Sequence, residues 1–205
     1  MSVPREKSEN VVWEGDALDR GRREELLGKR GATIWFTGLP GSGKSTVAAN
    51  LVAALAERGV IAYRLDGDNL RHGLCGDLSF APGDRDENVR RTAEVARLMA
   101  DAGVVTVVSL VSPYRAGRDK VRALHAEIGL CFLEVWVSTP LEVCEARDPK
   151  GLYARARRGE IPNMTGVDDP YEAPEDPEIE IKADTPADGA VEQVLAQLAA
   201  RGIAI

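Results

Sequence analysis

The chain has 205 residues, a formal net charge of −7, and 44% hydrophobic and 29% charged residues, which is ordinary for one soluble globular domain. The acidic balance argues against a general nucleic-acid or acidic-membrane surface, because proteins that bind such surfaces are usually basic. No apolar run approaches the roughly 20 residues of a bilayer span, no signal-peptide core is present, and the three cysteines form neither a disulfide framework nor a zinc motif. We therefore expect a cytoplasmic protein without nucleic-acid or membrane partners.

Apolar and helical patterns alternate along the chain. A polar N-terminal segment, residues 1–31, contains one short helical pattern at 17–30. Strand-like runs are expected at 32–38, 60–66, 104–112, 131–138 and 178–184. Helices are expected at 45–59, 85–103, 115–128, from Pro140 onward, and at 187–202. This alternation predicts an α/β domain over residues 32–205, with a five-stranded parallel sheet between two layers of helices.

Residues 148–178 interrupt this alternation. They are rich in Pro and charged residues and poor in aliphatic ones. A long segment of this kind inside a compact domain is more often a functional lid than a plain connector. The helix-like run at 151–160 argues against a disordered insert, so we expect a lid at about 148–177.

A glycine-rich stretch follows the first expected strand. "GLPGSGKS" (38–45) matches G-x-x-x-x-G-K-[ST] and opens a helix, as a phosphate-binding loop must. Lys44 would reach the β- and γ-phosphates of ATP, and Ser45 would ligate Mg²⁺. The residues expected to contact ATP are Gly38, Leu39, Pro40, Gly41, Ser42, Gly43, Lys44, Ser45 and Thr46.

"DGDN" (66–69) lies where the second strand should end, at the ligand-binding edge of an open α/β sheet. Asp66 or Asp68 could hold Mg²⁺ or accept a proton from an attacking hydroxyl, whereas a plain turn would use the same residue types. A GTPase would normally carry an N/T-K-x-D motif, which is absent, and a motor usually needs more chain. A small-molecule kinase fits best.

Several blocks in the same order resemble the adenylylsulfate (APS) kinase family over nearly the whole chain: "IWFTGLPGSGKST" (34–46), "DGDNLRHGL" (66–74), "DRDENVRR" (84–91), "SPYRAGRD" (112–119) and the stretch 148–179. The resemblance implies transfer of the ATP γ-phosphate to the 3′-hydroxyl of adenosine 5′-phosphosulfate (APS), with ATP as donor and Mg²⁺ as cofactor. Family members are commonly dimers, and an ATP sulfurylase is a further partner to expect.

The resemblance also implies the acceptor site. Arg71, Phe80, Arg85 and Asn88 match positions that bind APS, in keeping with the forked donors of arginine and the stacking face of Phe80. Phe80 could instead plug the core beneath its loop. Lys150 matches a lysine that lines the substrate site, while Met164 stands where the family commonly has a Phe that covers adenine.

Ser112, before Pro113, matches the family's active-site serine, which is associated with a phosphoserine form in some members. A buried serine with a backbone partner is the alternative. We expect direct in-line transfer, with Ser112, Asp68 and Lys44 as catalytic residues, Asp68 contacting the 3′-hydroxyl, and Asp66 near the metal and substrate. Arg115 and Arg118 could face the transferred phosphate or water, and His125 should lie on a helix surface.

Two alternatives remain open at this point. One is a related kinase for another small hydroxyl acceptor, such as a nucleoside or a sugar acid. The other is an ATP-binding regulatory subunit without turnover, partnered with an ATP sulfurylase.

Overall fold

The computed structural model describes residues 11–12, 14–15 and 18–203. Much of the N-terminal segment expected at residues 1–31 therefore lies outside the described residues. The elements in chain order are α1 (Arg20–Leu27), β1 (Ala32–Thr37), α2 (Lys44–Glu57), β2 (Ala62–Asp66), α3 (Gly67–Leu70), α4 (Pro82–Asp101), β3 (Val105–Ser109), α5 (Arg115–Ala126), β4 (Cys131–Val137), α6 (Leu141–Arg147), α7 (Leu152–Arg157), β5 (Ile179–Ile181) and α8 (Ala187–Ala200).

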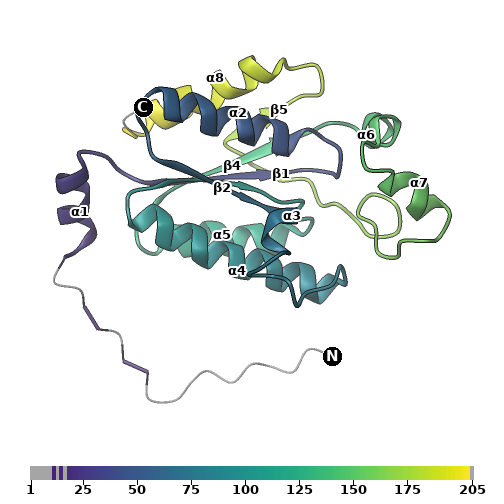
Figure 1. Cartoon of the computed structure of the whole chain (residues 1–205), viewed down its shortest axis with the longest axis horizontal. Coiled ribbons are helices and arrows are strands. Elements are labelled where there is room, and N and C mark those ends of the chain that lie inside the picture. The colour runs from purple at the N-terminus through teal and green to yellow at the C-terminus, as the bar shows by residue number, and fades with distance from the viewer. Residues whose placement is uncertain (1–10, 13, 16–17, 204–205) are drawn as a thin grey trace.

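In the described part of the chain, the strands form one parallel sheet in the order β2-β3-β1-β4-β5. Helices α2 and α8 cover one face and α4 and α5 the other (Figure 1). This arrangement confirms the predicted three-layer α/β fold. Because every crossover returns the chain in the same direction, the carboxyl ends of the strands gather at one edge, which is where ligands bind in such sheets.

The central strand β1 is buried along its whole length. Its alternating side chains reach opposite layers, as the two-residue period of a strand requires. Ile34 and Phe36 pack in the core toward α2 and α8, while Trp35 packs in the core toward α4 and α5. The strand that precedes the glycine-rich loop is thus fixed from both sides.

Two local expectations need correction. His125 was expected on a helix surface, but it is fully buried. Its Nε2 lies 2.9 Å from Thr33 Oγ1 and its Nδ1 lies 2.8 Å from the Val121 carbonyl oxygen. Burial lowers the pKa of this imidazole, so it serves as a neutral core residue. The third strand was expected to reach Ser112, but it ends at Ser109.

The stretch around α1 docks on the ends of three other helices. Arg20 donates to the Ile128 carbonyl oxygen just beyond α5 at 2.5 Å, and Arg23 donates to the Asp101 carbonyl oxygen at the end of α4 at 3.2 Å. Lys29 donates to the Gly59 carbonyl oxygen just beyond α2 at 2.6 Å. At Gly31 the backbone passes so close to the end of α4 that a Cβ would lie 2.1 Å from the Ala100 carbonyl oxygen, and only glycine fits there.

Among the described residues, none of the helices is long and apolar enough to cross a membrane.

Candidate functional site

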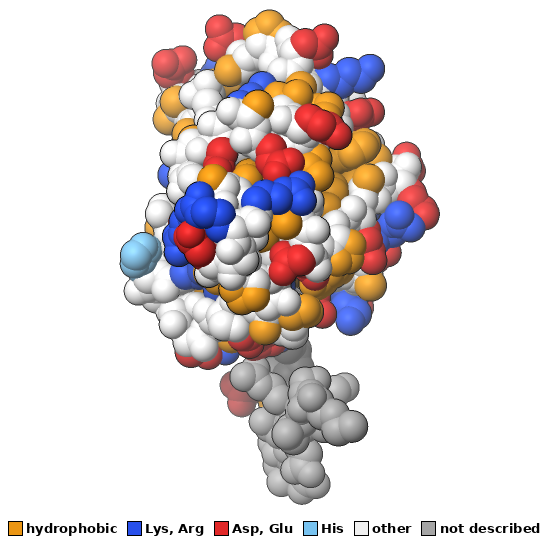
Figure 2. All heavy atoms as spheres, turned by 90° about the vertical axis from the view of Figure 1, so that its right-hand side faces the viewer, with side chains coloured by type: hydrophobic (Ala, Val, Ile, Leu, Met, Phe, Trp, Pro, Cys, Tyr) orange, Lys and Arg blue, Asp and Glu red, His pale blue; other side chains and the backbone are white. Residues whose placement is uncertain are grey.

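A cavity of about 680 Å³ opens at the carboxyl edge of the sheet. The glycine-rich loop, the end of β2, the chain after β3 and the segment around α6 and α7 all contribute to its wall. Figure 2 views the molecule from the side on which α6 and α7 lie in Figure 1, and basic and acidic side chains stand close together there among hydrophobic ones. The cavity therefore combines charge with apolar surface, as small-molecule sites commonly do.

The phosphate loop, residues 38–45, contributes part of the cavity lining. Gly38, Gly41 and Gly43 all have positive φ, and a Cβ at Gly38 would lie 2.6 Å from the Val137 carbonyl oxygen. The loop leads into α2, so its amides and the start of the helix favour an anion. The expected ATP-contacting residues that line the cavity are Pro40, Gly41, Gly43, Lys44, Ser45 and Thr46.

Lys44 folds back onto the loop. Its Nζ donates to the Gly38 and Leu39 carbonyl oxygens at 2.8 and 2.7 Å and to Ser42 Oγ at 3.3 Å. Burial lowers the pKa of this ammonium group from its ordinary value of 10.5 to about 8. Gly38, Leu39 and Ser42 therefore hold the lysine and do not line the cavity themselves. An arriving phosphate would offer the ammonium stronger partners than these neutral oxygens.

Asp66 lies beside the phosphate loop at the end of β2. Its carboxylate accepts hydrogen bonds from Ser109 Oγ at 2.8 Å and from the Asp68 amide at 3.1 Å. Burial raises the pKa of this carboxyl group, but hydrogen bonds from Ser109, Ser45 and the Asp68 amide outweigh it and leave the pKa below its ordinary value. Asp66 is thus ionised at neutral pH.

The pairing of Asp66 with Ser45 fits a divalent cation. Within the described residues no cluster of three or more His, Cys, Asp or Glu residues could hold a metal by itself. Mg²⁺ commonly binds through one or two protein oxygens, with phosphates and water completing its shell. The Asp66 carboxylate and the Ser45 hydroxyl, beside a phosphate loop, are therefore suitable ligands for Mg²⁺.

Asp68 and Lys150 form an ion pair across the cavity mouth. Asp68 is in α3, and Lys150 is in the loop between α6 and α7. Both side chains are mostly exposed, so their contact is screened by solvent and is easily exchanged for a ligand.

A second group of lining residues forms the acceptor wall, which we define as Phe80, Arg85, Met164 and Thr165. Phe80 is 55% exposed, so the alternative of a core plug is wrong. Arg71 does not line the cavity, but its guanidinium carbon lies 4.0 Å from the centre of the Phe80 ring and supports that ring from behind.

Arg85 ties the two halves of the acceptor wall together. Its guanidinium donates to Thr165 Oγ1, to the Asn163 carbonyl oxygen and to the Phe80 carbonyl oxygen, the last at 2.9 Å. Met164 is buried and packs with Cys144, Tyr153 and Ala156. The side chains that would meet the acceptor are therefore held by residues on both sides of the cavity.

Two further expected site residues, Ser112 and Asn88, do not line the cavity. Ser112 is 3% exposed, its φ is 39°, and its Oγ accepts a hydrogen bond from Trp35 Nε1 at 3.1 Å. Asn88 is 4% exposed, and its Nδ2 is buried without a hydrogen-bond partner. The Ser112 hydroxyl thus has a buried hydrogen-bond partner, whereas the Asn88 amide nitrogen has none.

Arg118 faces neither the transferred phosphate nor water, contrary to both expectations. It is 1% exposed and pairs with Glu134 of β4 at 2.7 Å. Arg115 pairs with Glu175 at the surface. The sequence did contain a signal, because a glutamate inside the apolar run of residues 131–138 requires a buried cation.

Sequence reasoning missed several cavity residues, namely Ser109, Leu110, Val111, Arg147, Tyr153 and Thr165. Ser109 could have been found from the register, since it pairs with Asp66 across neighbouring strands. The others lie in irregular stretches or short helices whose facing cannot be read from periodicity.

A phosphate loop and an ionised aspartate at the carboxyl edge of a parallel five-stranded sheet, roofed by a charged segment, define a P-loop kinase. The model of the adenylylsulphate kinase family matches residues 30–182. The chain belongs to that family.

Similar proteins cover most of the chain. It is 55% identical to an adenylyl-sulfate kinase of Klebsiella pneumoniae over 187 residues, 91% of this chain and 92% of that relative. The APS kinase of Mycobacterium tuberculosis, solved with AMPPNP and APS, superposes with a TM-score of 0.81 at 50% identity and covers 83% of this chain and 99% of that one. A hexameric APS kinase from Thiobacillus denitrificans gives a TM-score of 0.63 at 34% identity, covering 88% of this chain and 30% of that one.

Proposed function

We propose that this protein is an adenylylsulfate kinase. It transfers the γ-phosphoryl group of ATP to the 3′-hydroxyl of adenosine 5′-phosphosulfate and releases ADP and 3′-phosphoadenosine 5′-phosphosulfate. The observation that carries this proposal is one cavity lined both by the phosphate loop and by the acceptor wall of Phe80, Arg85, Met164 and Thr165.

The donor end binds the phosphates of ATP. Backbone amides of the phosphate loop and the Lys44 ammonium group neutralise and orient the chain of phosphates. Ser45 and Asp66 hold Mg²⁺, which supplies charge neutralisation for the transferred group when it is bound. Lys150, at the cavity mouth, adds positive charge when it leaves Asp68 for the phosphate.

The acceptor end holds the adenylate and presents its ribose. Phe80 stacks on adenine and Met164 covers the opposite face. Arg85 in the acceptor wall supplies positive charge for the sulfate–phosphate group, and Arg71 adds to it from behind the Phe80 ring. Asn88 would reach the substrate only after a rearrangement that turns its buried, unpartnered amide toward the cavity. Asp68 then accepts a hydrogen bond from the 3′-hydroxyl and takes its proton as the oxygen attacks phosphorus in line.

Transfer proceeds directly from ATP to the hydroxyl. Ser112 does not line the cavity, and within the described residues the hydrogen-bond partner of its hydroxyl is the Trp35 indole nitrogen rather than a base. A phosphoserine route would need such a base. We therefore give Ser112 a supporting rather than a reacting role.

The catalytic domain spans residues 32–205, after the N-terminal segment 1–31. Residues 148–177 act as the lid, since α7, Lys150 and Met164 all lie within this segment at the mouth or wall of the cavity. A closed lid would exclude water, which otherwise competes with the acceptor.

The assembly we propose is a homodimer that receives its substrate from an ATP sulfurylase. A hexameric relative supports self-association in general. Sedimentation analysis of the purified chain checks the dimer, and a monomer at micromolar concentration would contradict it.

A coupled ADP-release assay tests the activity. With ATP and Mg²⁺ present, APS should give ADP release, whereas nucleosides and gluconate should give background rates. Release with a nucleoside or gluconate but not with APS would assign the chain to another small hydroxyl acceptor. ATP binding without ADP release on any acceptor would indicate a regulatory subunit.

A further inference from the structure

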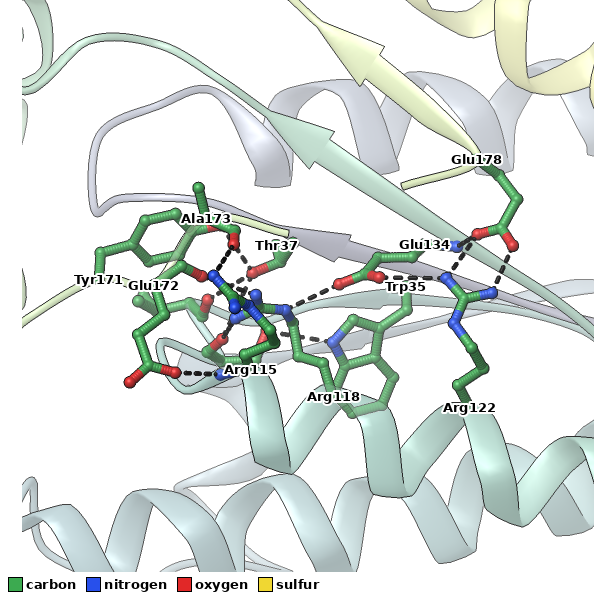
Figure 3. A network of polar contacts seen from close by, with 12 residues as sticks. Trp35, Thr37, Arg115, Arg118, Arg122, Glu134, Tyr171, Glu172, Ala173 and Glu178 are labelled. Atoms are coloured by element: carbon green, nitrogen blue, oxygen red, sulfur yellow. Dashed lines mark hydrogen bonds and ion pairs between the residues drawn. The ribbon is translucent and has the colours of Figure 1, made fainter. Parts of the chain in front are cut away.

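A polar network fastens the chain that returns from the lid onto α5 (Figure 3). We call residues 171–178 the return segment. Arg115, Arg118 and Arg122 lie at spacings of three and four residues and so share one face of α5. Each contacts the return segment: Arg115 pairs with Glu175, Arg118 donates to the Glu172 carbonyl oxygen at 2.6 Å, and Arg122 pairs with Glu178.

The centre of this network is buried, whereas its edge is exposed to solvent. Arg118 has a side chain 1% exposed and Glu134 one 7% exposed, whereas Arg115 and Glu175 are 41% and 75% exposed. The buried guanidinium of Arg118 donates three hydrogen bonds to three separate segments of the chain. Its acceptors are Glu134 Oε1 at 2.7 Å, the Ser112 carbonyl oxygen at 2.7 Å and the Glu172 carbonyl oxygen at 2.6 Å.

Stability alone gives little reason for such an arrangement. A buried ion pair costs much of its Coulombic gain in desolvation, and apolar residues of similar volume often stabilise a core as well. What apolar residues cannot do is hold two backbone carbonyl groups at fixed positions. One of these belongs to Ser112, which has a positive φ of 39° that serine rarely adopts.

The same region meets the strand that bears the phosphate loop. Thr37, the last residue of β1, donates from Oγ1 to the Val111 carbonyl oxygen at 2.8 Å. Tyr171 of the return segment lies with its hydroxyl 3.1 Å from Thr37 Oγ1. Thr37, which precedes the phosphate loop, therefore contacts both the turn at Ser112 and the return segment.

From this point, hydrogen bonds lead to the acceptor wall. Tyr114, two residues after Ser112, has its hydroxyl 2.8 Å from Asp169 Oδ1. The Asp169 carbonyl oxygen accepts from the Gly166 amide at 2.8 Å, next to Thr165. Thr165 in turn accepts from Arg85. The wall is thus connected to the turn through Tyr114 and Asp169. The phosphate loop is held by its own backbone, by Lys44, and by Thr139 and Tyr153, whose hydroxyl groups donate to the Ser42 and Pro40 carbonyl oxygens at 2.9 Å.

We infer that Arg118 is a positioning residue for the acceptor: it holds the turn at Ser112 and the return segment at Glu172 in register with β1, and so places the acceptor wall opposite the phosphate loop. This inference rests on the proposed kinase function. It assigns to Arg118 no contact with substrate.

The test compares Arg118→Met and Arg118→Lys with Arg122→Met as the matched control. Arg118→Met leaves Glu134 paired with Arg122, which lies 3.1 Å away, so no carboxylate is stranded. Arg122→Met breaks two ion pairs of the same network without touching Ser112 or Glu172, and Glu134 then keeps Arg118. Lysine keeps the charge of Arg118 but lacks the fork that spans its three acceptors.

Steady-state kinetics are measured well below each variant's melting temperature, with APS and ATP varied separately. Both Arg118 variants should raise the KM for APS by about tenfold, with the KM for ATP changed less than about twofold, because a displaced wall misorients only the acceptor. Arg122→Met should leave both constants close to those of the wild type while lowering the melting temperature by a similar amount.

Equal kinetic effects in the Arg118 and Arg122 variants, or a lower melting temperature with unchanged constants, would overturn the inference. If both Arg118 variants fail to fold, Tyr171→Phe provides a milder test. It removes only the hydrogen bond to Thr37 and should raise the KM for APS without changing the KM for ATP. An unchanged KM for APS in that variant would count against the inference. Wild-type protein that releases no ADP with APS would instead refute the proposed function.

Discussion

Burial of Lys44 disfavours its charged form, and the resulting cost in folding free energy can be measured. In the ligand-free protein its pKa is about 8, whereas an unfolded lysine has its ordinary value of 10.5. Between these pH values the unfolded chain binds a proton that the folded chain does not. The free energy of unfolding must therefore rise as pH increases from 8 to 10.5, and this gain disappears as pH falls back toward 8. Lys44→Met removes the titrating group and supplies the baseline.

The size of the effect follows from the shift. One pKa unit corresponds to about 1.4 kcal/mol, so at pH 7 the buried charge costs about 3 kcal/mol of folding free energy. At pH 9.5 roughly 1.4 kcal/mol of that cost remains. The wild type should thus gain about 2 kcal/mol relative to Lys44→Met between pH 7 and pH 9.5. For a chain of this length that amounts to about 4 to 8 °C in melting temperature.

Urea or thermal unfolding of both proteins without nucleotide, at several pH values, gives this difference directly. Other titrating groups cancel because the two chains share them. A difference that stays flat from pH 7 to pH 9.5, or one that falls, would refute the reasoning. As a second readout, ATP binding near pH 9 should be accompanied by proton uptake in the wild type and not in the variant, since the phosphates restore the charge of Lys44.

Four substitutions test the cavity. Phe80→Ala should raise the KM for APS about tenfold with little loss of stability, because the ring is largely exposed and available for stacking; a lower melting temperature with an unchanged KM would mean that the ring only packs. Asp68→Asn should lower kcat by at least about 100-fold while ATP binding is kept, and near-full turnover would exclude its role as base. Ser112→Ala should keep kcat within about tenfold, because its hydroxyl faces Trp35; a loss as large as that of Asp68→Asn would favour a phosphoserine step. Met164→Phe should lower the KM for APS a few-fold by adding an aromatic face, and an unchanged KM would show that this position does not meet adenine.

The elements that the sequence predicted well are those with strong local signals. The glycines of the phosphate loop need positive φ, and the apolar runs before and after it have lengths that fit strands and helices. Asp66 followed from the rule that ligands gather at the carboxyl edge of a parallel sheet, and in the structure it lies there beside Ser45.

The errors concern polar residues whose partners are far away in the chain. His125 and Arg118 look like solvent-facing helix residues, because hydropathy cannot reveal Thr33 and Glu134 in neighbouring strands. Ser112 was expected at a strand end, but the chain leaves the sheet three residues earlier to make a turn that tertiary contacts stabilise. Long-range hydrogen bonds, not local propensity, fix these positions.

The basic side chains around α1 have a consequence for how the protein tolerates change. Arg20, Arg23 and Lys29 sit where the dipoles of α5, α4 and α2 concentrate negative charge, on the side away from the cavity. A shortened chain that began at residue 32 would keep every strand and every cavity-lining side chain, yet it would lose these three cations, each worth about 0.5 kcal/mol at a helix end. We therefore expect substitutions of these three residues to lower the melting temperature while leaving the turnover rate close to that of the wild type, because none of them lines the cavity.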